Sequence, residues 1–506
     1  MKIKYLIAIS LLVVSANVKG QNNQAVFYND PHRPQIHFTP KEKWMNDPNG
    51  MVYYKGVYHL FFQYYPDSTV WGPMHWGHAI SKDLIHWSEQ PIALYPDSLG
   101  YIFSGSAVVD VNNTSGFGKN GKVPLVAIFT HHDPKGERAS RSDFQYQSIA
   151  YSLDEGKTWT KYEGNPVVKN PGIRDFRDPK VIWFEGGKKW IMTLATKDRV
   201  TFYSSKNLKD WTKESEFGEK VGAQGGVWEC PDLFPLKHNG QTHWVLLVSI
   251  NPGAPNGGSG TQYFVGQFNG KEFTPYQTKT KWIDYGTDNY AGITWSNTGN
   301  RKIFLGWMSN WQYATKVPTD KWRSAMTVPR DLALRMIGEE YMLVSHPITE
   351  LNSIKQKPVV LKNIEATNYN LTKKTGKLSG PAVLTIKGQK LAAFTITLSN
   401  DIGEQLIIGY DQTSNQYFID RTKAGKSEFE NGFAKKHIAP RYSTKENIDL
   451  TLIIDNASVE LFADEGLLSM TEIFFPNKLY SDINIQSSSA FKIDSLVYNK
   501  LKSIWD

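Results

Sequence analysis

The chain has 506 residues, enough for about two to four domains, and this length excludes a small scaffold held together by disulfides or a metal. It carries 57 lysines and arginines against 49 acidic residues, a formal net charge of +8. No dense basic segment follows the N-terminal leader, so we expect no nucleic-acid partner. The single cysteine, Cys230, excludes an internal disulfide. Aromatic residues reach 13% of the chain, and so many rings must line a core, a ligand groove or both.

The first twenty residues have the layout of a secretory signal peptide. Lys2 and Lys4 precede an apolar run over residues 5–14, which is too short to span a bilayer. A buried first helix is the alternative, but the residues that follow Gly20 are polar and lack a helical period. No cysteine follows the run, so we expect no lipid anchor. The sequence therefore predicts a bacterial protein exported to the periplasm or the extracellular space, with residues 1–20 as its signal peptide.

Apolar stretches of strand composition recur five times, at intervals of about 60 residues. The five stretches lie at 58–65, 123–132, 188–196, 242–250 and 302–308. Three of the stretches are followed by similar polar hairpins that end in a tryptophan. Short strands repeated at a nearly constant period of this length are typical of propeller blades. The sequence therefore predicts a five-bladed β-propeller over residues 21–350.

A second strand with a polar opening precedes each apolar stretch. These strands lie at 46–54, 103–110, 176–184, 228–236 and 288–296. If they are the innermost strands of the blades, their first residues converge on one mouth of the central channel. Asp47, Asp178 and Glu229 are then brought together, although they are far apart in the sequence.

The character of the sequence changes after about residue 350. Alternating strands appear at 393–398, 405–410, 450–454 and 459–462, without a motif rich in histidine or acidic residues. We expect a linker over 355–361 and a two-sheet β-sandwich over residues 356–506. The whole chain is thus predicted to be all-β, a propeller followed by a sandwich. Sugar binding, dimerisation and support of the propeller are open roles for the sandwich, and we favour support.

Carboxylates at a channel mouth among aromatic rings suit the chemistry of sugars. Cleavage of a glycosidic bond needs one carboxylate to attack the anomeric carbon and one carboxylic acid to protonate the leaving oxygen. Glu229, flanked by Trp228 and Cys230, is the candidate for an acid in apolar surroundings, and Asp47, beside Asn46, is the candidate for the ionised carboxylate. Taken alone, Asp47 is equally a turn residue.

Two other features have simpler interpretations than the ones they first suggest. His75 and His78 have the spacing of a metal-binding pair, but no third ligand is near in sequence, so we favour packing or groove lining and expect no metal. Cys230 lacks an accompanying histidine motif and is interpreted as a small buried thiol rather than a nucleophile.

Five separated motifs resemble glycoside hydrolase family 32, which contains β-fructofuranosidases, inulinases and levanases. They are WMNDPNG (44–50), FSGS (103–106), FRDP (176–179), WECPD (228–232) and GWMSNWQY (306–313). The resemblance covers almost the whole chain after the leader. It implies a five-bladed propeller with a C-terminal β-sandwich, in agreement with the repeat count.

The resemblance also implies a role for each acid. Asp47 would attack the anomeric C2 of a fructofuranosyl unit, Glu229 would act as acid and then as base, and Asp178 would stabilise the transition state without transferring a proton. Such a retaining reaction implies a separation of about 5–5.5 Å between the Asp47 and Glu229 carboxyls. Arg177, next to Asp178, is expected to lower the pKa of that carboxyl. The positions that would hold the terminal fructose are Asn46, Gln63, Trp71, Phe103, Ser104, Arg177 and Trp311.

The predicted function is release of terminal fructose from β-fructans such as levan and inulin, with sucrose as a further candidate substrate. Exo action is favoured because a funnel whose carboxylates lie at its narrow end would hold a chain terminus. An endo-levanase, a fructosyltransferase and a non-catalytic fructan-binding propeller are the alternatives, and the three retained carboxylates argue against the last. We expect no cofactor and no membrane anchor. The preferred linkage and the oligomeric state are left open.

Overall fold

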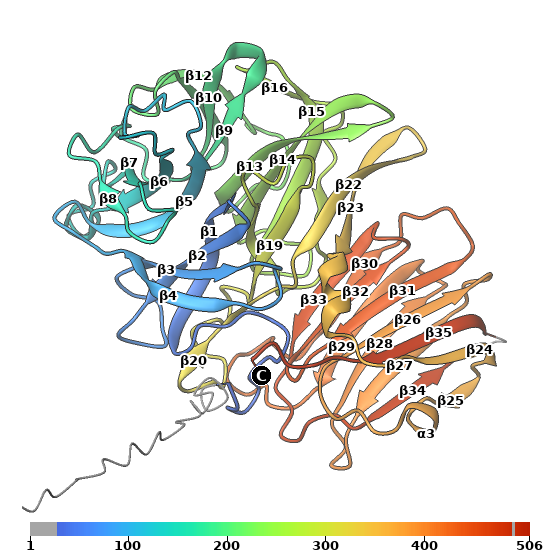
Figure 1. Cartoon of the computed structure of the whole chain (residues 1–506). Coiled ribbons are helices and arrows are strands. Elements are labelled where there is room, and N and C mark those ends of the chain that lie inside the picture. The colour runs from blue at the N-terminus through green and yellow to red at the C-terminus, as the bar shows by residue number, and fades with distance from the viewer. Residues whose placement is uncertain (1–27, 488–490, 506) are drawn as a thin grey trace, which may run out of the picture.

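The structure is a computed structural model that describes residues 28–487 and 491–505, and the predicted signal peptide lies outside the described residues. Strands dominate, and two lobes lie side by side (Figure 1). The helical segments within these residues are short: α2 (Pro134–Arg138), η1 (Glu185–Gly187), η2 (Thr349–Ile354) and α3 (Thr372–Thr375). The predicted all-β fold is therefore confirmed.

Five antiparallel sheets follow one another along the first lobe of the described chain. The first sheet contains β1 (Lys43–Tyr54), β2 (Val57–Tyr65), β3 (His75–Ser81), β4 (Ser88–Leu94) and, paired in parallel with β1, β20 (Trp322–Arg323). The second contains β5 (Tyr101–Val109), β6 (Leu125–His132), β7 (Gln145–Ser152) and β8 (Thr160–Lys161). The third contains β9 (Phe176–Phe184), β10 (Lys189–Thr196), β11 (Val200–Ser205) and β12 (Thr212–Phe217).

The last two sheets of this lobe are built in the same way. The fourth contains β13 (Val227–His238), β14 (Gln241–Asn251), β15 (Gly260–Phe268), β16 (Phe273–Pro275) and β17 (Lys281–Trp282). The fifth contains β18 (Tyr290–Thr294), β19 (Ile303–Met308), β21 (Ala325–Met326), β22 (Arg330–Ile337) and β23 (Glu340–Pro347).

The first strands of the five sheets close a ring. Strand β1 contacts β5, β5 contacts β9, β9 contacts β13, β13 contacts β18, and β18 contacts β1. These are the strands that the sequence places innermost, so their N-terminal ends meet at one end of the ring. Apolar clusters fill the space between neighbouring sheets; one such cluster joins Val126 of β6 to Met192 of β10.

Each innermost strand carries one extra residue near its N-terminal end. The register against the next strand shifts by one residue between Met45 and Pro48, Ile102 and Gly105, Arg177 and Lys180, Glu229 and Asp232, and Tyr290 and Ile293. A bulge of this kind breaks the alternation of side chains between the two faces and turns a local side chain to a new direction. Three residues in these bulges have positive φ, namely Asp178 (65°), Cys230 (45°) and Ala291 (54°).

The second lobe is a sandwich of two six-stranded sheets, with one continuous apolar core between them. One sheet has the order β24 (Val359–Glu365), β35 (Lys492–Lys500), β26 (Ala382–Gly388), β31 (Ile448–Ile454), β32 (Ser458–Ala463) and β33 (Leu468–Ile473). The other has the order β25 (Asn368–Asn370), β34 (Asp482–Gln486), β27 (Phe394–Ser399), β28 (Gln405–Asp411), β29 (Gln416–Lys423) and β30 (Lys436–Pro440). Alternating burial along β27 is the pattern that the sequence predicts for a strand with one face on the core.

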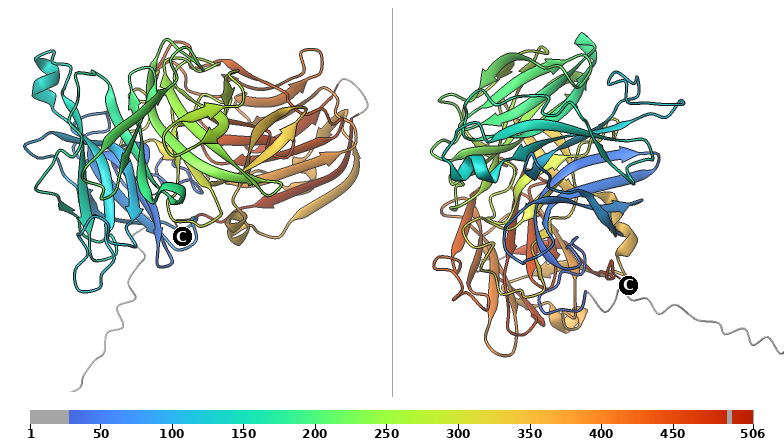
Figure 2. Two further views of the ribbon diagram at one scale, coloured as in Figure 1. Left: turned by 90° about the horizontal axis from the view of Figure 1, so that it is seen from above. Right: turned by 90° about the vertical axis from the view of Figure 1, so that its left-hand side faces the viewer.

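The C-terminal segment returns to the junction of the two lobes, as the left view of Figure 2 shows. The Trp505 ring stacks on Tyr28 at 3.7 Å between ring centroids, and its indole N–H donates to the Pro34 carbonyl at 2.9 Å. The Ile504 N–H donates to the Gln35 carbonyl at 2.9 Å. The two ends of the described chain therefore tie the sandwich to the propeller.

Candidate active site

Asp47 lies in the β1 bulge, and both of its carboxylate oxygens accept hydrogen bonds. The Asn46 amide donates to Oδ1 at 2.9 Å, and the Ser104 hydroxyl donates to Oδ2 at 2.8 Å. Asn46 is itself held by the indole N–H of the fully buried Trp44, at 2.7 Å. Burial and the charge of Glu229 raise the pKa of Asp47, and the two hydrogen bonds oppose this. The predicted neighbours therefore fix the orientation of this carboxylate.

Asp178 lies in the β9 bulge and is almost fully buried. Its Oδ2 accepts the backbone N–H of Cys230 at 3.0 Å, and its own N–H donates to the Thr130 hydroxyl at 3.1 Å. Burial raises the pKa of Asp178 to about 7, although the Arg177 guanidinium acts in the opposite direction. Arg177 lowers the pKa of this carboxyl as expected, but the cost of burying the charge is larger, so the pKa is raised overall.

Glu229 is held by a cation and a phenol. The Arg177 guanidinium donates to Oε1 from Nε at 3.1 Å and from Nη2 at 3.0 Å, and the Tyr290 hydroxyl donates to Oε2. The prediction that this carboxyl lies in apolar surroundings is therefore wrong. Trp228 turns away and donates its indole N–H to the Ala223 carbonyl, because side chains alternate across the strand.

Cys230 joins the three acids. Its thiol lies 3.5 Å from Asp47 Oδ2 and 3.6 Å from Asp178 Oδ2, and the residue directly follows Glu229. Burial and the surrounding carboxylates raise the pKa of the thiol well above its usual value, so the sulfur is protonated and is a weak donor rather than a nucleophile. The carboxylates of Asp47 and Asp178, from two sheets, thus meet at this thiol, and the charge of Glu229 lies close enough to raise the pKa of both. The predicted distance between the Asp47 and Glu229 carboxyl groups stays a prediction.

Three of the predicted site residues, Trp71, Phe103 and Trp311, are aromatic and partly exposed. The Trp71 ring is 40% exposed and meets Phe103 edge to face at 6.0 Å, and Phe103 stacks on His132 at 4.3 Å. Trp311 packs on the Trp307 ring at 4.9 Å. These partly exposed rings are surfaces on which a sugar can stack its C–H face.

Gln63 lies on β2, in the stretch that pairs with the bulged part of β1. Its side chain is buried, and its Nε2 has no hydrogen-bond partner within residues 28–487 and 491–505. A buried donor without a partner is costly, which makes this amide a candidate donor to a bound ligand.

Two contributors to the site are absent from the sequence prediction. The Tyr290 hydroxyl donates to Glu229, and Tyr290 is the first residue of β18, the innermost strand of the fifth sheet. The rule that functional residues lie at the start of the innermost strands therefore also predicts Tyr290. Asp175 accepts from Arg177 Nη1 at 2.6 Å and fixes the other end of the guanidinium. The only sequence signal for the role of Asp175 is its position two residues before Arg177.

Comparison with known proteins decides the family. A model described as the glycosyl hydrolases family 32 N-terminal domain matches residues 37–347, and the model of the family's C-terminal domain matches residues 350–500. The chain belongs to glycosyl hydrolase family 32. The resemblance seen in the five motifs is therefore confirmed.

Individual family 32 members match over most of their length. The chain is 45% identical to a levanase of Bacillus subtilis (strain 168) over 518 residues, which covers 99% of this chain and 75% of the levanase. It is 43% identical to an extracellular exo-inulinase of Aspergillus awamori over 491 residues, which covers 89% and 90% of the two chains.

Solved structures agree with these matches. The crystal structure of exo-inulinase from Aspergillus awamori superposes with a TM-score of 0.85 at 40% identity, over 94% of this chain and 100% of that one. The β-fructofuranosidase from Schwanniomyces occidentalis complexed with fructosyl-erythritol also gives a TM-score of 0.85, at 35% identity, over 95% and 99% of the two chains. The family fold of a propeller followed by a β-sandwich is therefore confirmed.

The histidine pair of this family 32 chain has partners other than a metal. His75 Nδ1 bonds to the Pro73 carbonyl at 2.9 Å, and His78 Nε2 bonds to His59 Nδ1 at 3.1 Å. The His78 ring also stacks on Phe61 at 4.3 Å. The described residues contain no group of three or more His, Cys, Asp or Glu side chains that could hold a metal ion. No helix in the same residues is long and apolar enough to cross a bilayer.

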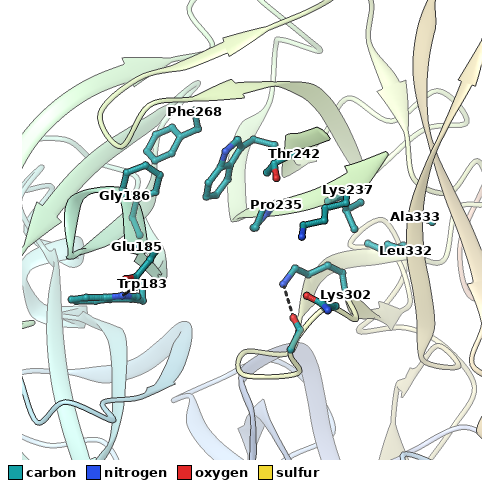
Figure 3. A pocket seen from close by; sticks show the side chains of 15 residues that line it. Trp183, Glu185, Gly186, Pro235, Lys237, Thr242, Phe268, Lys302, Leu332 and Ala333 are labelled. Carbon is teal, nitrogen blue, oxygen red and sulfur yellow. Dashed lines mark hydrogen bonds between the residues drawn. The ribbon is translucent and has the colours of Figure 1, made fainter. Parts of the chain in front are cut away.

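A pocket of about 750 Å³ lies at the other end of the innermost strands (Figure 3). Trp183 and Pro235, near the C-terminal ends of β9 and β13, line it together with Lys237 and Lys302, and it contains none of the predicted site residues. The acids lie at the opposite ends of these strands.

Proposed function

We propose that this protein is a retaining exo-β-fructosidase that releases terminal fructose from β-fructans such as levan and inulin, with sucrose as a further substrate. The observation that carries the proposal is the convergence of Asp47, Asp178 and Glu229 around the Cys230 thiol, with contacts of 3.5 and 3.6 Å from that sulfur to two of the carboxylates. The levanase and exo-inulinase relatives, at 45% and 43% identity, support the fructan as the class of substrate.

In the first step, Asp47 attacks the anomeric C2 of the terminal fructose, and the bond between C2 and the glycosidic oxygen breaks. Glu229 gives its proton to that oxygen, so the leaving sugar departs as a neutral alcohol. The hydrogen bonds from Asn46 and Ser104 hold both oxygens of Asp47, which keeps the attacking lone pair directed at one point.

In the second step, Glu229 takes a proton from water while the water oxygen attacks C2, and Asp47 is released as a carboxylate. Positive charge develops on the sugar ring in both transition states. Asp178 stabilises this charge when ionised, and its backbone is anchored by Thr130. Arg177 orients Glu229 through two donors and is itself fixed by Asp175.

The fructose ring is proposed to lie between the acids and three aromatic side chains. Trp71 and Phe103 offer ring faces and edges, Gln63 offers an unpaired donor, and Trp311 closes the side next to β19. Stacking of C–H faces on rings combined with hydrogen bonds to carboxylates and amides is the chemistry that selects a sugar.

We also propose that the protein is exported, with residues 1–20 as a signal peptide, to the periplasm or the extracellular space of a bacterium. Residues 21–350 are proposed as the catalytic propeller domain, and residues 356–506 as the sandwich domain. The Aspergillus awamori relative, an extracellular exo-inulinase, supports export of this chain.

The test is fructose release from levan, inulin and sucrose by the wild-type protein, by Glu229→Gln and by the matched control Glu185→Gln. Glu185 is an exposed glutamate in the pocket at the opposite end of the strands. We expect Glu229→Gln to lower kcat by about 10²–10⁴-fold and the control to stay near the wild-type rate. Fructose as the sole early product from levan supports exo action, and oligosaccharides overturn it. Binding of fructan without turnover by the wild-type protein would favour the non-catalytic alternative.

A further inference from the structure

The segment before β18 lies along the edge of the sandwich. The Tyr285 N–H donates to the Ser469 carbonyl at 2.8 Å, and the Asp288 N–H donates to the Thr471 carbonyl at 3.1 Å, both on the edge strand β33. At Gly286 the two backbones approach so closely that a Cβ would lie 2.1 Å from the Thr471 carbonyl oxygen. Residues 284–288 of the propeller are thus added to the sandwich sheet as if they were a further strand.

A buried ionic network holds this segment from the sandwich side. Arg421 on β29 lies 2.8 Å from Asp288 Oδ2 and 2.9 Å from Glu472 Oε2, and all three side chains are fully buried. The Ile473 N–H donates to Asp288 Oδ2 at 2.9 Å, and the Tyr313 hydroxyl donates to Asp288 Oδ1 at 2.6 Å. Asp288 therefore has a fixed position that depends on two strands of the sandwich.

The segment leads directly to the acid. Asp288 precedes Tyr290 by two residues, and the residue between them, Asn289, is buried and donates to Asp284 Oδ2 at 3.1 Å. Tyr290 is also buried, and its hydroxyl donates to Glu229 Oε2. Asp288, Asn289 and Tyr290 are all buried, and packed interiors transmit strain. A displacement of Asp288 is therefore expected to move Tyr290, which donates the hydrogen bond to Glu229.

We propose that Arg421 of the sandwich is a positioning residue for Glu229 and acts through Asp288 and Tyr290. This inference rests on the proposed function, in which Glu229 protonates the leaving oxygen. The sandwich then contributes to the alignment of the acid as well as to the stability of the fold.

The chemistry of the leaving group separates alignment from stability. Departure of glucose from sucrose needs a proton from Glu229, whereas departure of fluoride from β-fructofuranosyl fluoride does not. The quantity to measure is the ratio of kcat/KM on sucrose to kcat/KM on the fluoride. Loss of folded protein lowers both values together and leaves the ratio unchanged, while misalignment of Glu229 lowers the ratio.

The variants are Arg421→Met, Tyr290→Phe and the double variant, in the full chain. We expect each single variant to lower the ratio by about 10- to 100-fold, the range that a misplaced catalytic group costs. We expect the double variant to lower it no further than the stronger single variant, because both act on the same contact. Arg421→Lys keeps the cation and is expected to lower the ratio by only about threefold. It replaces the Met variant as the test if that variant fails to fold.

Arg441→Met is the matched control. Arg441 pairs with Asp464 at 3.0 Å inside the sandwich, without a contact to residues 284–290, so its loss is expected to leave the ratio unchanged. An unchanged ratio in both Arg421 variants, or equal falls in the Arg421 and Arg441 variants, overturns the inference. If the fall in the ratio for the double variant equals the product of the falls for the two single variants, Arg421 does not act through Tyr290. A wild-type protein that hydrolyses neither donor overturns the proposed function instead.

Discussion

His37 is a buried cation at the junction of the two domains, and its protonation ties stability to pH. Its ring lies 2.8 Å from Asp455 Oδ2 and 2.9 Å from Glu460 Oε1, both in the sandwich, and all three side chains are fully buried. Burial alone would lower the pKa of His37, but the hydrogen bonds to the two carboxylates outweigh it and raise the pKa to about 9.

The size of the effect follows from this pKa. The unfolded value is 6.5, so the folded value is higher by about 2.5, which corresponds to about 3 kcal/mol at 1.36 kcal/mol for each pKa unit. The sign follows from the direction. Because the folded protein binds the proton more tightly, the contribution is fully present below pH 6.5 and is lost as the pH rises through about 9. The junction is therefore expected to weaken in alkali.

The test compares the wild-type protein with His37→Gln in guanidinium unfolding followed by tryptophan fluorescence between pH 6 and 9.5. We expect the variant to be less stable by about 3 kcal/mol at pH 6, and the difference to shrink toward pH 9.5. His86→Gln is the control, since His86 and its partner Asp83 are about half exposed. A difference in the free energy of unfolding between wild type and His37→Gln that stays constant from pH 6 to pH 9.5 would refute the reasoning.

Four further predictions concern the active site. Asp47→Asn is expected to lower kcat for inulin at least about 10³-fold in a fructose-release assay, because the amide does not attack C2. Asp178→Asn is expected to abolish turnover and yet to raise stability at pH 7 by on the order of 1–3 kcal/mol in thermal unfolding. Burial raises the pKa of Asp178 from 3.8 to about 7, so ionisation costs stability increasingly across that pH range. Cys230 is expected to resist iodoacetamide at pH 8 until the chain is unfolded in urea, as followed by mass spectrometry, because burial raises the pKa of its thiol. Trp71→Ala is expected to raise KM for inulin about tenfold with kcat within about twofold, since it removes an exposed stacking surface and leaves the reacting carboxyls in place.

The repeat pattern was sufficient to predict which residues meet. Strand openings at a constant period place Asp47, Asp178 and Glu229 at one end of a ring, and the contacts of Cys230 agree with this. The same rule extends to Tyr290, because it too opens an innermost strand. Period and strand polarity are properties of the sequence alone, which is why this part of the site was predictable.

The partners of individual side chains were not predictable in the same way. Arg177 is adjacent to Asp178 in the sequence, yet its guanidinium binds Glu229, because the β9 bulge turns neighbouring side chains in different directions. Contacts between the domains were also hidden, since Arg421 and Asp288 are 133 positions apart and neither belongs to a recognisable motif. Local sequence carries no signal for an ion pair of this kind.

The extra residue in each innermost strand has a consequence for the design of variants. Side chains along a strand change face with every residue, so removal of one residue from a bulge would rotate all preceding positions of that strand by half a turn. A single-codon deletion near Pro48 or Pro231 would then send the functional carboxyl toward the wall of the blade and bring its hydrophobic neighbour into the channel. The bulges therefore fix the number of residues at the inner rim of the ring.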